Sequence, residues 1–463
     1  MNQDTIAAIS TGMTNSGIGI VRISGSEALE IADRVYKGKE TITEVPTHTI
    51  HYGHVMDGDE TVDEVLVMVM RGPRTFTGED TVEINCHGGT YVVSRVLETV
   101  LKAGARPAEP GEFTKRAFLN GKMDLSQAEA VIDVITSENE YALQSSISQL
   151  KGSVKNRIKE IREKIIYHTA FIETALDDPE HISVDGYGEV LKEAAEEVID
   201  QLKELIDSSD DGRIMKEGIQ TVILGKPNAG KSSLLNILAG HDRAIVTDIE
   251  GTTRDVLEEQ IRLQGLTLNI IDTAGIRETN DTIESLGIER TFQKLDQAEI
   301  VLWMIDSVNA ASQIEQLSEK IIPRCEGKHL IAVFNKADLI EEKQKEDLLT
   351  LLKDFSKEYT ESIFISAKQR GNTEELQKML INAAHLPTVT QNDIIVTNVR
   401  HYEALSKALE AIHRVQDGLD SQISGDFLSQ DIRECIFFIS DIAGEVTNDM
   451  VLQNIFQHFC IGK

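Results

Sequence analysis

Residues 221–232 read Thr221-Val222-Ile223-Leu224-Gly225-Lys226-Pro227-Asn228-Ala229-Gly230-Lys231-Ser232. The last eight fit the pattern G-x-x-x-x-G-K-[ST], after a strand-like run and before a predicted helix at Ser233–Ala239. In this arrangement backbone N–H groups face phosphate oxygens, the lysine reaches the β- and γ-phosphates, and the serine hydroxyl binds Mg²⁺. We therefore predict a phosphate-binding loop formed by Asn228, Ala229, Gly230, Lys231, Ser232 and Ser233.

The region around this loop, residues 218–382, alternates apolar runs with helical stretches. The predicted buried strands are Thr221–Leu224, Asn269–Ile271, Ile300–Ile305, Leu330–Phe334 and Ile363–Ile365. A strand–helix alternation of this kind is typical of a parallel sheet with helices on both faces.

Three further short motifs follow in the order that a GTPase requires. The Asp272 carboxylate of Asp272-Thr273-Ala274-Gly275 can hold Mg²⁺ through water, and the Gly275 N–H can contact the γ-phosphate. Asp338 of Asn335-Lys336-Ala337-Asp338 can accept two hydrogen bonds from guanine, which adenine cannot donate. Ser366-Ala367-Lys368 predicts the loop behind the guanine, and Thr253 of Gly251-Thr252-Thr253 is the predicted second Mg²⁺ ligand.

One position departs from small signalling GTPases. Ile276 follows Gly275 where those proteins carry a glutamine that orients the attacking water, and isoleucine has no polar group for that task. Four acidic side chains nearby are alternatives, and the sequence by itself does not choose among Glu278, Asp281, Glu284 and Glu289.

The chain on either side of this region has a different character. Residues 1–118 predict a mixed α/β domain with strands Gly19–Ser24, Thr47–Val55, Glu64–Met70 and Thr81–Cys86 and a helix at Thr90–Lys102. Apolar residues recur at helical spacing in residues 119–217 and 383–463. We predict a multidomain α/β and α protein, in which residues 218–382 are inserted into a helical domain built from the two flanking segments.

Composition narrows the function classes. The 463 residues include 46 Lys+Arg and 77 Asp+Glu, a net charge of −31, which argues against a protein that grips nucleic acid alone by a large basic surface. The four cysteines show no metal-binding spacing. The start shows no signal peptide and no apolar run is long enough to span a bilayer, so we expect a cytoplasmic protein without a membrane partner.

The motifs together resemble one family. The stretches GKPNAGKSSLLN (225–236), VTDIEGTTRD (246–255), DTAGIRET (272–279) and NKAD (335–338) are similar to the TrmE–Era–EngA group of P-loop GTPases. Residues outside that region narrow the resemblance to the MnmE (TrmE) family: Asp4–Ala7, Gly17–Gly25, Phe76–Asp80, His87–Gly89, Pro110–Phe118 and the terminal Phe459–Lys463.

The resemblance implies an architecture and a reaction. It implies an N-terminal α+β folate-binding-like domain that dimerises the chain, and a Ras-like G domain inserted in the helical domain. With an MnmG-like flavoprotein that carries FAD, in a heterotetramer or larger complex, the homodimer would modify C5 of the wobble uridine, position 34. It would install an aminomethyl or carboxymethylaminomethyl group from 5-formyl- or methylene-tetrahydrofolate. The tRNA would be bound mainly with the partner.

The resemblance also implies residue roles. K⁺ would be held by Asn228, Thr247, Ile249 and Thr252, in the place where an arginine finger stabilises charge in other GTPases. The same loop adds Asp248 and Glu250 to the GTP site, and Glu284 would position the water as a catalytic residue beside Lys231. Folate would be bound by Arg22, Glu83, Lys122 and Lys463.

Two other function classes are alternatives to a tRNA modification GTPase. A regulatory or ribosome-assembly GTPase would carry a basic RNA-binding module, and none is visible in the sequence. A folate-dependent transferase with a vestigial GTPase would not be expected to keep Lys231, Ser232, Thr253 and Asp272.

Overall fold

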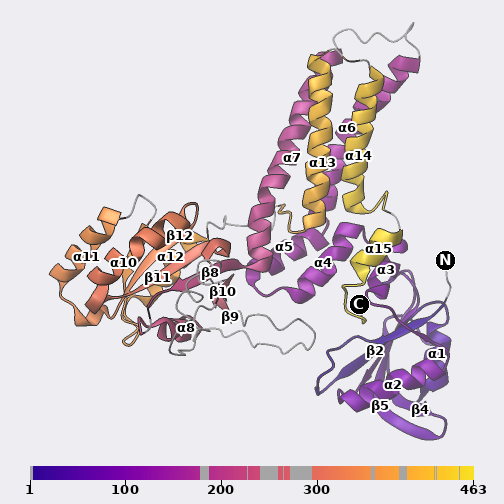
Figure 1. Cartoon of the computed structure of the whole chain (residues 1–463). Coiled ribbons are helices and arrows are strands. Elements are labelled where there is room, and N and C mark those ends of the chain that lie inside the picture. The colour runs from indigo at the N-terminus through magenta and orange to yellow at the C-terminus, as the bar shows by residue number, and fades with distance from the viewer. Residues whose placement is uncertain are drawn as a thin grey trace, which may run out of the picture. The chain divides into compact units, whose positions relative to one another are not determined.

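The computed structural model describes residues 4–177, 187–226, 228–239, 259–263, 265–271, 295–355, 360–384, 394–421, 423, 425–447 and 449–462. The chain forms two compact units, coloured along the sequence in Figure 1. The first contains residues 1–136, 146–206 and 399–463, and the second contains residues 137–145 and 207–398. The second unit therefore interrupts the first in sequence. Among the described residues, no helix is both long and apolar enough to cross a membrane.

The N-terminal part of the first unit is a seven-stranded sheet in the order β3-β4-β5-β6-β2-β1-β7. Its neighbours are antiparallel except for β1 and β7, which are parallel. The elements are β1 (Ile6–Ile9), β2 (Gly19–Ser24), α1 (Ala28–Val35), β3 (Tyr36–Gly38), β4 (Thr49–Asp57), β5 (Glu60–Met70), β6 (Thr81–Cys86), α2 (Thr90–Lys102), β7 (Arg106–Pro107) and α3 (Glu112–Leu119).

Buried and more exposed side chains alternate along the strands, so the two faces of this sheet differ. On β2, Val21 and Ile23 are fully buried in a core with residues of α1 and α2, so these helices cover one face. Arg22 lies between them in sequence and therefore points to the opposite face. That second face carries exposed apolar side chains on β4 and β5, among them Ile50, Tyr52 and Leu66.

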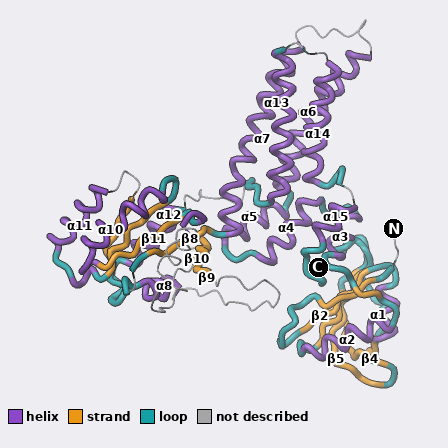
Figure 2. Tube along the Cα trace, viewed as in Figure 1, coloured by secondary structure: helices purple, strands orange, loops and turns teal. Residues whose placement is uncertain are grey.

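The rest of the first unit is helical. Helices α6 (Ser153–Asp177), α7 (Tyr187–Glu217), α13 (Val399–Asp420) and α14 (Gly425–Ala443) run side by side, as Figure 2 shows. Ion pairs such as Lys192–Asp420 and Arg157–Glu204 join neighbouring helices at the surface. Helices α4 (Leu125–Thr136) and α15 (Asp449–Phe456) also belong to the first unit, and sequence boundaries between the two units fall within α5 (Glu140–Leu150) and α7. Buried Ile, Leu, Val and Ala residues recur at helical spacing on the packed faces.

A buried ion cluster joins the two sequence segments of the helical part. Arg400 at the start of α13 donates to both carboxylate oxygens of Glu129 on α4, each at 2.9 Å, and His401 Nε2 lies 2.7 Å from Glu129 Oε2. Arg400 also donates to the carbonyl oxygens of Asp441 and Ile442, near the end of α14. Burial alone raises the pKa of Glu129, but the charges and hydrogen bonds of His401 and Arg400 outweigh it and lower that pKa to about 2.

This depressed pKa makes the stability of the first unit sensitive to acid. The Glu129 pKa lies below its ordinary 4.5, so its stabilisation is complete above that value and is lost as the pH falls toward 2. The shift corresponds to roughly 3 kcal/mol in the free energy of unfolding. Urea unfolding of wild type and Glu129→Gln, followed by far-UV circular dichroism, should show a stability gap that is constant from neutral pH down to about 4.5 and narrows below it. A gap of constant size would contradict this assignment.

The second unit contains a six-stranded sheet in the order β13-β12-β11-β8-β10-β9. Its neighbours are parallel except for β9 and β10, which form an antiparallel pair at one edge. The strands are β8 (Ile219–Leu224), β9 (Glu259–Leu263), β10 (Leu266–Ile271), β11 (Ile300–Asp306), β12 (His329–Asn335) and β13 (Thr360–Phe364). The helices are α8 (Lys231–Ala239), α10 (Ala310–Ile321), α11 (Glu342–Phe355) and α12 (Thr373–Ala383).

Helices cover both faces of this second sheet. Side chains of α8 and α12 share one apolar core with the strands, and side chains of α10 and α11 share another on the opposite face. The central strands β8, β11 and β12 are buried along most of their length, as expected for strands packed on both faces. The prediction of a parallel α/β domain in this region is confirmed.

Candidate functional site

A cavity of about 470 Å³ lies beyond the carboxyl ends of β8, β12 and β13. Three loops line it, each following one of these strands, and open parallel α/β sheets bind ligands at this edge. The first loop contributes Asn228, Gly230, Lys231, Ser232 and Ser233, the second Asn335, Lys336, Asp338 and Leu339, and the third Ser366, Ala367 and Lys368. The structure therefore brings together three sequence motifs that are up to about 140 residues apart.

Backbone geometry explains the glycines of the first loop. Gly225 has φ +154°, and a Cβ there would lie 2.5 Å from the Met304 carbonyl oxygen. Gly230 has φ +100°, and a Cβ there would lie 2.0 Å from Asn335 Nδ2. Asn228 has φ 62°, the left-handed conformation that asparagine tolerates better than most residues. The loop thus turns sharply between β8 and the first residue of α8.

Lys231 and Ser232 stand at the start of α8. The ammonium group of Lys231 donates to the Gly225 carbonyl oxygen at 2.5 Å, so the side chain folds back over the loop. Ser232 is exposed in the first turn of the helix, at the edge of the cavity. A helix N-terminus with a lysine and a hydroxyl group offers N–H donors, a positive charge and an oxygen ligand to a polyphosphate.

Asn335 ties the three loops together. Its side chain is buried, donates to the Ala229 carbonyl oxygen at 2.8 Å and accepts from the Ala367 N–H at 3.0 Å. The first contact fixes the phosphate-binding loop, and the second fixes the loop after β13. Asn335 therefore sets the width of the cavity in addition to lining it.

Three residues that the sequence analysis did not select lie at or next to the second and third loops, namely Asp306, Leu339 and Gln369. Lys336 is in the left-handed conformation, and its ammonium pairs with Asp306 at the end of β11, at 2.6 Å. Asp338 is exposed, and Gln369 Nε2 lies 3.3 Å from its Oδ2. Leu339 lines the cavity. Leu339 and Gln369 each directly follow a selected motif, whereas Asp306 carried no sequence signal beyond its place at a strand end.

Several predicted site residues lie outside the described residues. They are Thr247, Asp248, Ile249, Glu250, Gly251, Thr252, Thr253, Asp272, Thr273, Ala274, Gly275, Glu284 and Lys463. The predictions for the second Mg²⁺ ligand, most of the K⁺ site, the water-positioning residue and the terminal lysine stay predictions.

A second polar site lies on the N-terminal sheet. Arg22 on β2 and Glu83 on β6 are cross-strand partners, and Arg22 Nε donates to Glu83 Oε1 at 2.8 Å. Both side chains are 16% exposed. The pair projects from the sheet face opposite α1 and α2.

Aromatic rings and the C-terminal segment surround Arg22. Its guanidinium carbon lies 5.8 Å from the ring centroid of Phe76 and 5.6 Å from that of Phe113. Its Nη1 lies 3.4 Å from the Gly462 carbonyl oxygen, which also accepts from Ser10 Oγ at 3.1 Å. The C-terminal segment thus reaches Arg22, with the exposed Cys460 anchored by a backbone hydrogen bond from Gly111 to its carbonyl oxygen.

Lys122 is the third described member of the predicted folate set. It follows α3, and its ammonium donates to the Pro73 carbonyl oxygen at 2.9 Å. Arg22 and Glu83 are in direct contact, whereas no direct contact joins Lys122 to either of them among the described residues.

The fold and the cavity define a P-loop protein whose site has the elements of a guanine-nucleotide site. Two family models match the chain, "GTP-binding protein TrmE N-terminus" over residues 5–122 and "MnmE helical domain" over residues 125–460. The chain is 62% identical to tRNA modification GTPase MnmE of Bacteroides thetaiotaomicron over 466 residues, covering 100% of both chains. It is 56% identical to that of Bacteroides fragilis, again over 100% of both. The chain belongs to the MnmE family of tRNA modification GTPases.

Among solved structures, Era of Aquifex aeolicus bound to GDP·AlF₄⁻ is 29% identical. The match covers 42% of this chain and 66% of that one, at a TM-score of 0.29.

Proposed function

We propose that this GTP hydrolase, which as a member of its family takes part in tRNA modification, is a K⁺-stimulated enzyme that acts with folate at the tRNA wobble uridine. Membership in the MnmE family and the cavity lined by three loops support the binding and hydrolysis of GTP. The Arg22–Glu83 pair supports the proposed binding of folate. We propose the division into residues 1–118, 119–217, 218–382 and 383–463 as its domain plan.

Different described residues would bind the phosphates, the guanine and the Mg²⁺ of GTP. The N–H groups at the start of α8 and Lys231 face the polyphosphate, and Asp338 accepts hydrogen bonds from the guanine. Mg²⁺ use follows from membership in a GTPase family, and the exposed hydroxyl of Ser232 is the hard oxygen ligand that this ion prefers. When bound, the ion neutralises charge on the β- and γ-phosphates. Asn335 keeps the loops at the spacing that one nucleotide needs.

Asn228 is the described residue that supports the K⁺ proposal. Its side chain is exposed, lines the cavity, and makes no hydrogen bond to any described residue. Its amide oxygen is therefore available to a cation beside the phosphates, where added positive charge stabilises the transition state of phosphoryl transfer. Thr247, Ile249 and Thr252 would complete the site, and Glu284 would position the water.

The K⁺ proposal predicts a specific salt effect. Steady-state GTP hydrolysis in K⁺ buffer should exceed that in Na⁺ buffer of equal ionic strength by about tenfold or more, since equal ionic strength removes screening as a cause. Asn228→Ala should lose this acceleration, whereas Asn309→Ala, at an exposed asparagine on η1 (Ser307–Asn309) that does not line the cavity, should keep it. Equal wild-type rates in both buffers would eliminate the K⁺ mechanism.

The modification chemistry rests on the N-terminal site. Arg22 would bind the carboxylate tail of 5-formyl- or methylene-tetrahydrofolate, with Lys122 and Lys463 as further cations, and Glu83 would accept from the pterin N–H groups. Arg22 can hold Glu83 and still bind a carboxylate, because a guanidinium has five donors and no described residue accepts from Nη2. An MnmG-like flavoprotein with FAD would complete the reaction and provide most of the tRNA contact.

A homodimer is part of the same proposal. The sheet face that α1 and α2 leave open carries Ile50, Tyr52 and Leu66, which are 58%, 59% and 47% exposed. Apolar side chains grouped in this way support a protein interface. Sedimentation equilibrium should give twice the chain mass of 51.3 kDa, and a monomer at all concentrations would contradict the dimer.

A further inference from the structure

One loop contacts two of the proposed folate ligands. This segment, the 71–80 loop, joins β5 to β6. Its Phe76 ring lies against the Arg22 guanidinium, and its Pro73 carbonyl oxygen accepts from Lys122. The two cations come from different elements, so the position of the 71–80 loop decides where both of them stand.

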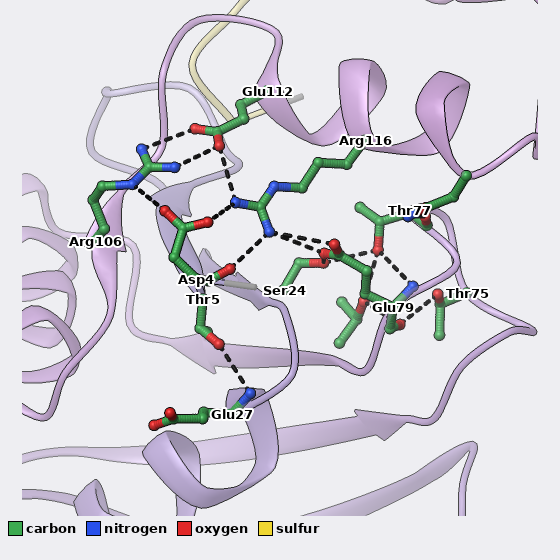
Figure 3. A network of polar contacts seen from close by, with 12 residues as sticks. Asp4, Thr5, Ser24, Glu27, Thr75, Thr77, Glu79, Arg106, Glu112 and Arg116 are labelled. Carbon is green, nitrogen blue, oxygen red and sulfur yellow. Dashed lines mark hydrogen bonds and ion pairs between the residues drawn. The ribbon is translucent and has the colours of Figure 1, made fainter. Parts of the chain in front are cut away.

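Glu79 fixes this loop from within. Its Oε2 accepts from Ser24 Oγ on β2 at 2.8 Å, and both of its carboxylate oxygens lie 3.3 Å from Arg116 Nη1 on α3 (Figure 3). The Glu79 backbone carbonyl accepts from Thr75 Oγ1 at 2.7 Å, and its N–H donates to Thr77 Oγ1 at 3.2 Å. The loop residues that flank Phe76 are therefore tied to Glu79.

Arg116 connects this loop to the rest of the domain. It donates to the Asp4 backbone oxygen at 2.9 Å, to Asp4 Oδ1 at 2.8 Å and to Glu112 Oε1 at 3.0 Å. Arg106 pairs with the same two acids, as Figure 3 shows. The hydrogen bond from Arg106 is the main cause that holds the pKa of Asp4 below its ordinary value, so this carboxyl is ionised at neutral pH.

The pairing of Arg116 with Glu79 is hard to replace. The Arg116 side chain is 10% exposed, and among the described residues it is the one cation that forms an ion pair with Glu79. Removing the Arg116 charge would leave the partly buried Glu79 carboxylate without a cation, whereas Arg116 would keep Asp4 and Glu112 if the Glu79 charge were removed. Phe113, the second ring beside Arg22, lies one helical turn before Arg116 on α3. The ion pair therefore fixes both aromatic contacts of Arg22.

We propose that Glu79 and Arg116 are positioning residues for the folate site, because their ion pair fixes the 71–80 loop and α3 and thereby places Arg22 and Lys122. This inference rests on the proposed function of the Arg22–Glu83 site. Neither Glu79 nor Arg116 contacts the ligand in this proposal. They act through Phe76, Phe113 and Pro73.

The test is calorimetric binding of 5-formyl-tetrahydrofolate to the full chain. Glu79→Gln keeps the side-chain volume and removes the charge, and should raise the Kd by about tenfold or more, as loss of a residue that orients a metal ligand does at metal sites. GTP hydrolysis should stay within about twofold of wild type. Arg116→Lys keeps the positive charge but loses the planar guanidinium that donates to several acceptors at once. The Kd of the Arg116→Lys chain should lie between the Kd values of wild type and Arg116→Met.

The matched control is Glu129→Gln. It also neutralises a buried carboxylate paired with an arginine in the first unit, and Glu129 makes no hydrogen bond or ion pair with the 71–80 loop. It should lower the thermal midpoint and leave the Kd unchanged. An equal loss of affinity in Glu129→Gln and Glu79→Gln would reduce the effect to general destabilisation and overturn the positioning role.

The remaining outcomes separate the two proposals. If wild type binds the probe, Arg22→Met abolishes binding and Glu79→Gln binds like wild type, the folate site stands and the positioning role falls. If wild type does not bind the probe at all, the folate site itself falls, and the positioning role with it. Should Glu79→Gln fail to fold, Ser24→Ala removes a hydroxyl that donates to Glu79 and also lies 2.8 Å from Thr77 Oγ1 in the same loop, and it should raise the Kd by about threefold.

Discussion

A Lys231→Ala chain is expected to hydrolyse GTP at least about 100-fold more slowly than wild type. Lys231 stands at the first position of α8, where its ammonium can reach the β- and γ-phosphates and stabilise the charge that develops on them. Preorganised donors of this kind contribute about 10²–10³ in rate when a single one is removed. The measurement is kcat and KM for GTP hydrolysis in K⁺ buffer, together with the Kd of a fluorescent GTP analogue.

Lys226→Ala is the matched control for this prediction. Lys226 belongs to the same loop, but its ammonium donates to Gln316 Oε1 and it does not line the cavity. Its loss should change kcat and KM by less than about threefold. A Lys231→Ala chain that kept wild-type kcat would remove Lys231 from the catalytic machinery.

Asp338→Asn is expected to raise the KM for GTP at least about 100-fold and to lower the KM for XTP. Hydrogen bonds to a charged group contribute about 1.5–3 kcal/mol each, and Asp338 can accept two from guanine. Asparagine offers one acceptor and one donor, a pattern that matches xanthine, whose C2 substituent is a carbonyl. Steady-state hydrolysis of both nucleotides by wild type and variant gives the two ratios.

The control for the nucleotide switch is Asp347→Asn. Asp347 is exposed on α11 outside the cavity, so the same chemical change there should leave both KM values unaltered. Weaker use of GTP without any gain for XTP would mean that Asp338 acts on the loop geometry and does not read the base.

Much of the fold could be predicted because the relevant signals are local in sequence. The strand Gly19–Ser24 and the helix Thr90–Lys102 have the predicted bounds, since β-branched alternation and helical periodicity are properties of adjacent residues. The phosphate-binding loop is recognisable for the same reason. Ile6–Ile9, by contrast, forms β1 although its four residues carry no alternation, and pairing with β2 and β7 makes it a strand.

The parts that could not be predicted depend on contacts between distant residues. No sequence pattern pairs Arg22 with Glu83, which are 61 positions apart, or brings Gly462 to Arg22. The motifs around Asp4, Glu79 and Arg116 were recognised by resemblance alone, and the structure supplies a physical reason for them in one shared ion network. Likewise, Asn335 was selected as a base-loop residue, but its contact with Ala229 follows only from the order of strands in the sheet.

The link between Glu129 and Arg400 has a consequence for how the chain folds during synthesis. The two residues are 271 positions apart, so the ribosome delivers the whole inserted unit before Arg400 exists. Until then α4 cannot bury Glu129 without an uncompensated charge. Domains fold as units in their order of emergence, so the nucleotide-binding unit is expected to fold before the helical core closes. Gly462, which contacts Arg22, follows Arg400 in sequence and therefore emerges later than Arg400. A nascent chain can thus acquire its nucleotide site well before its N-terminal site is complete.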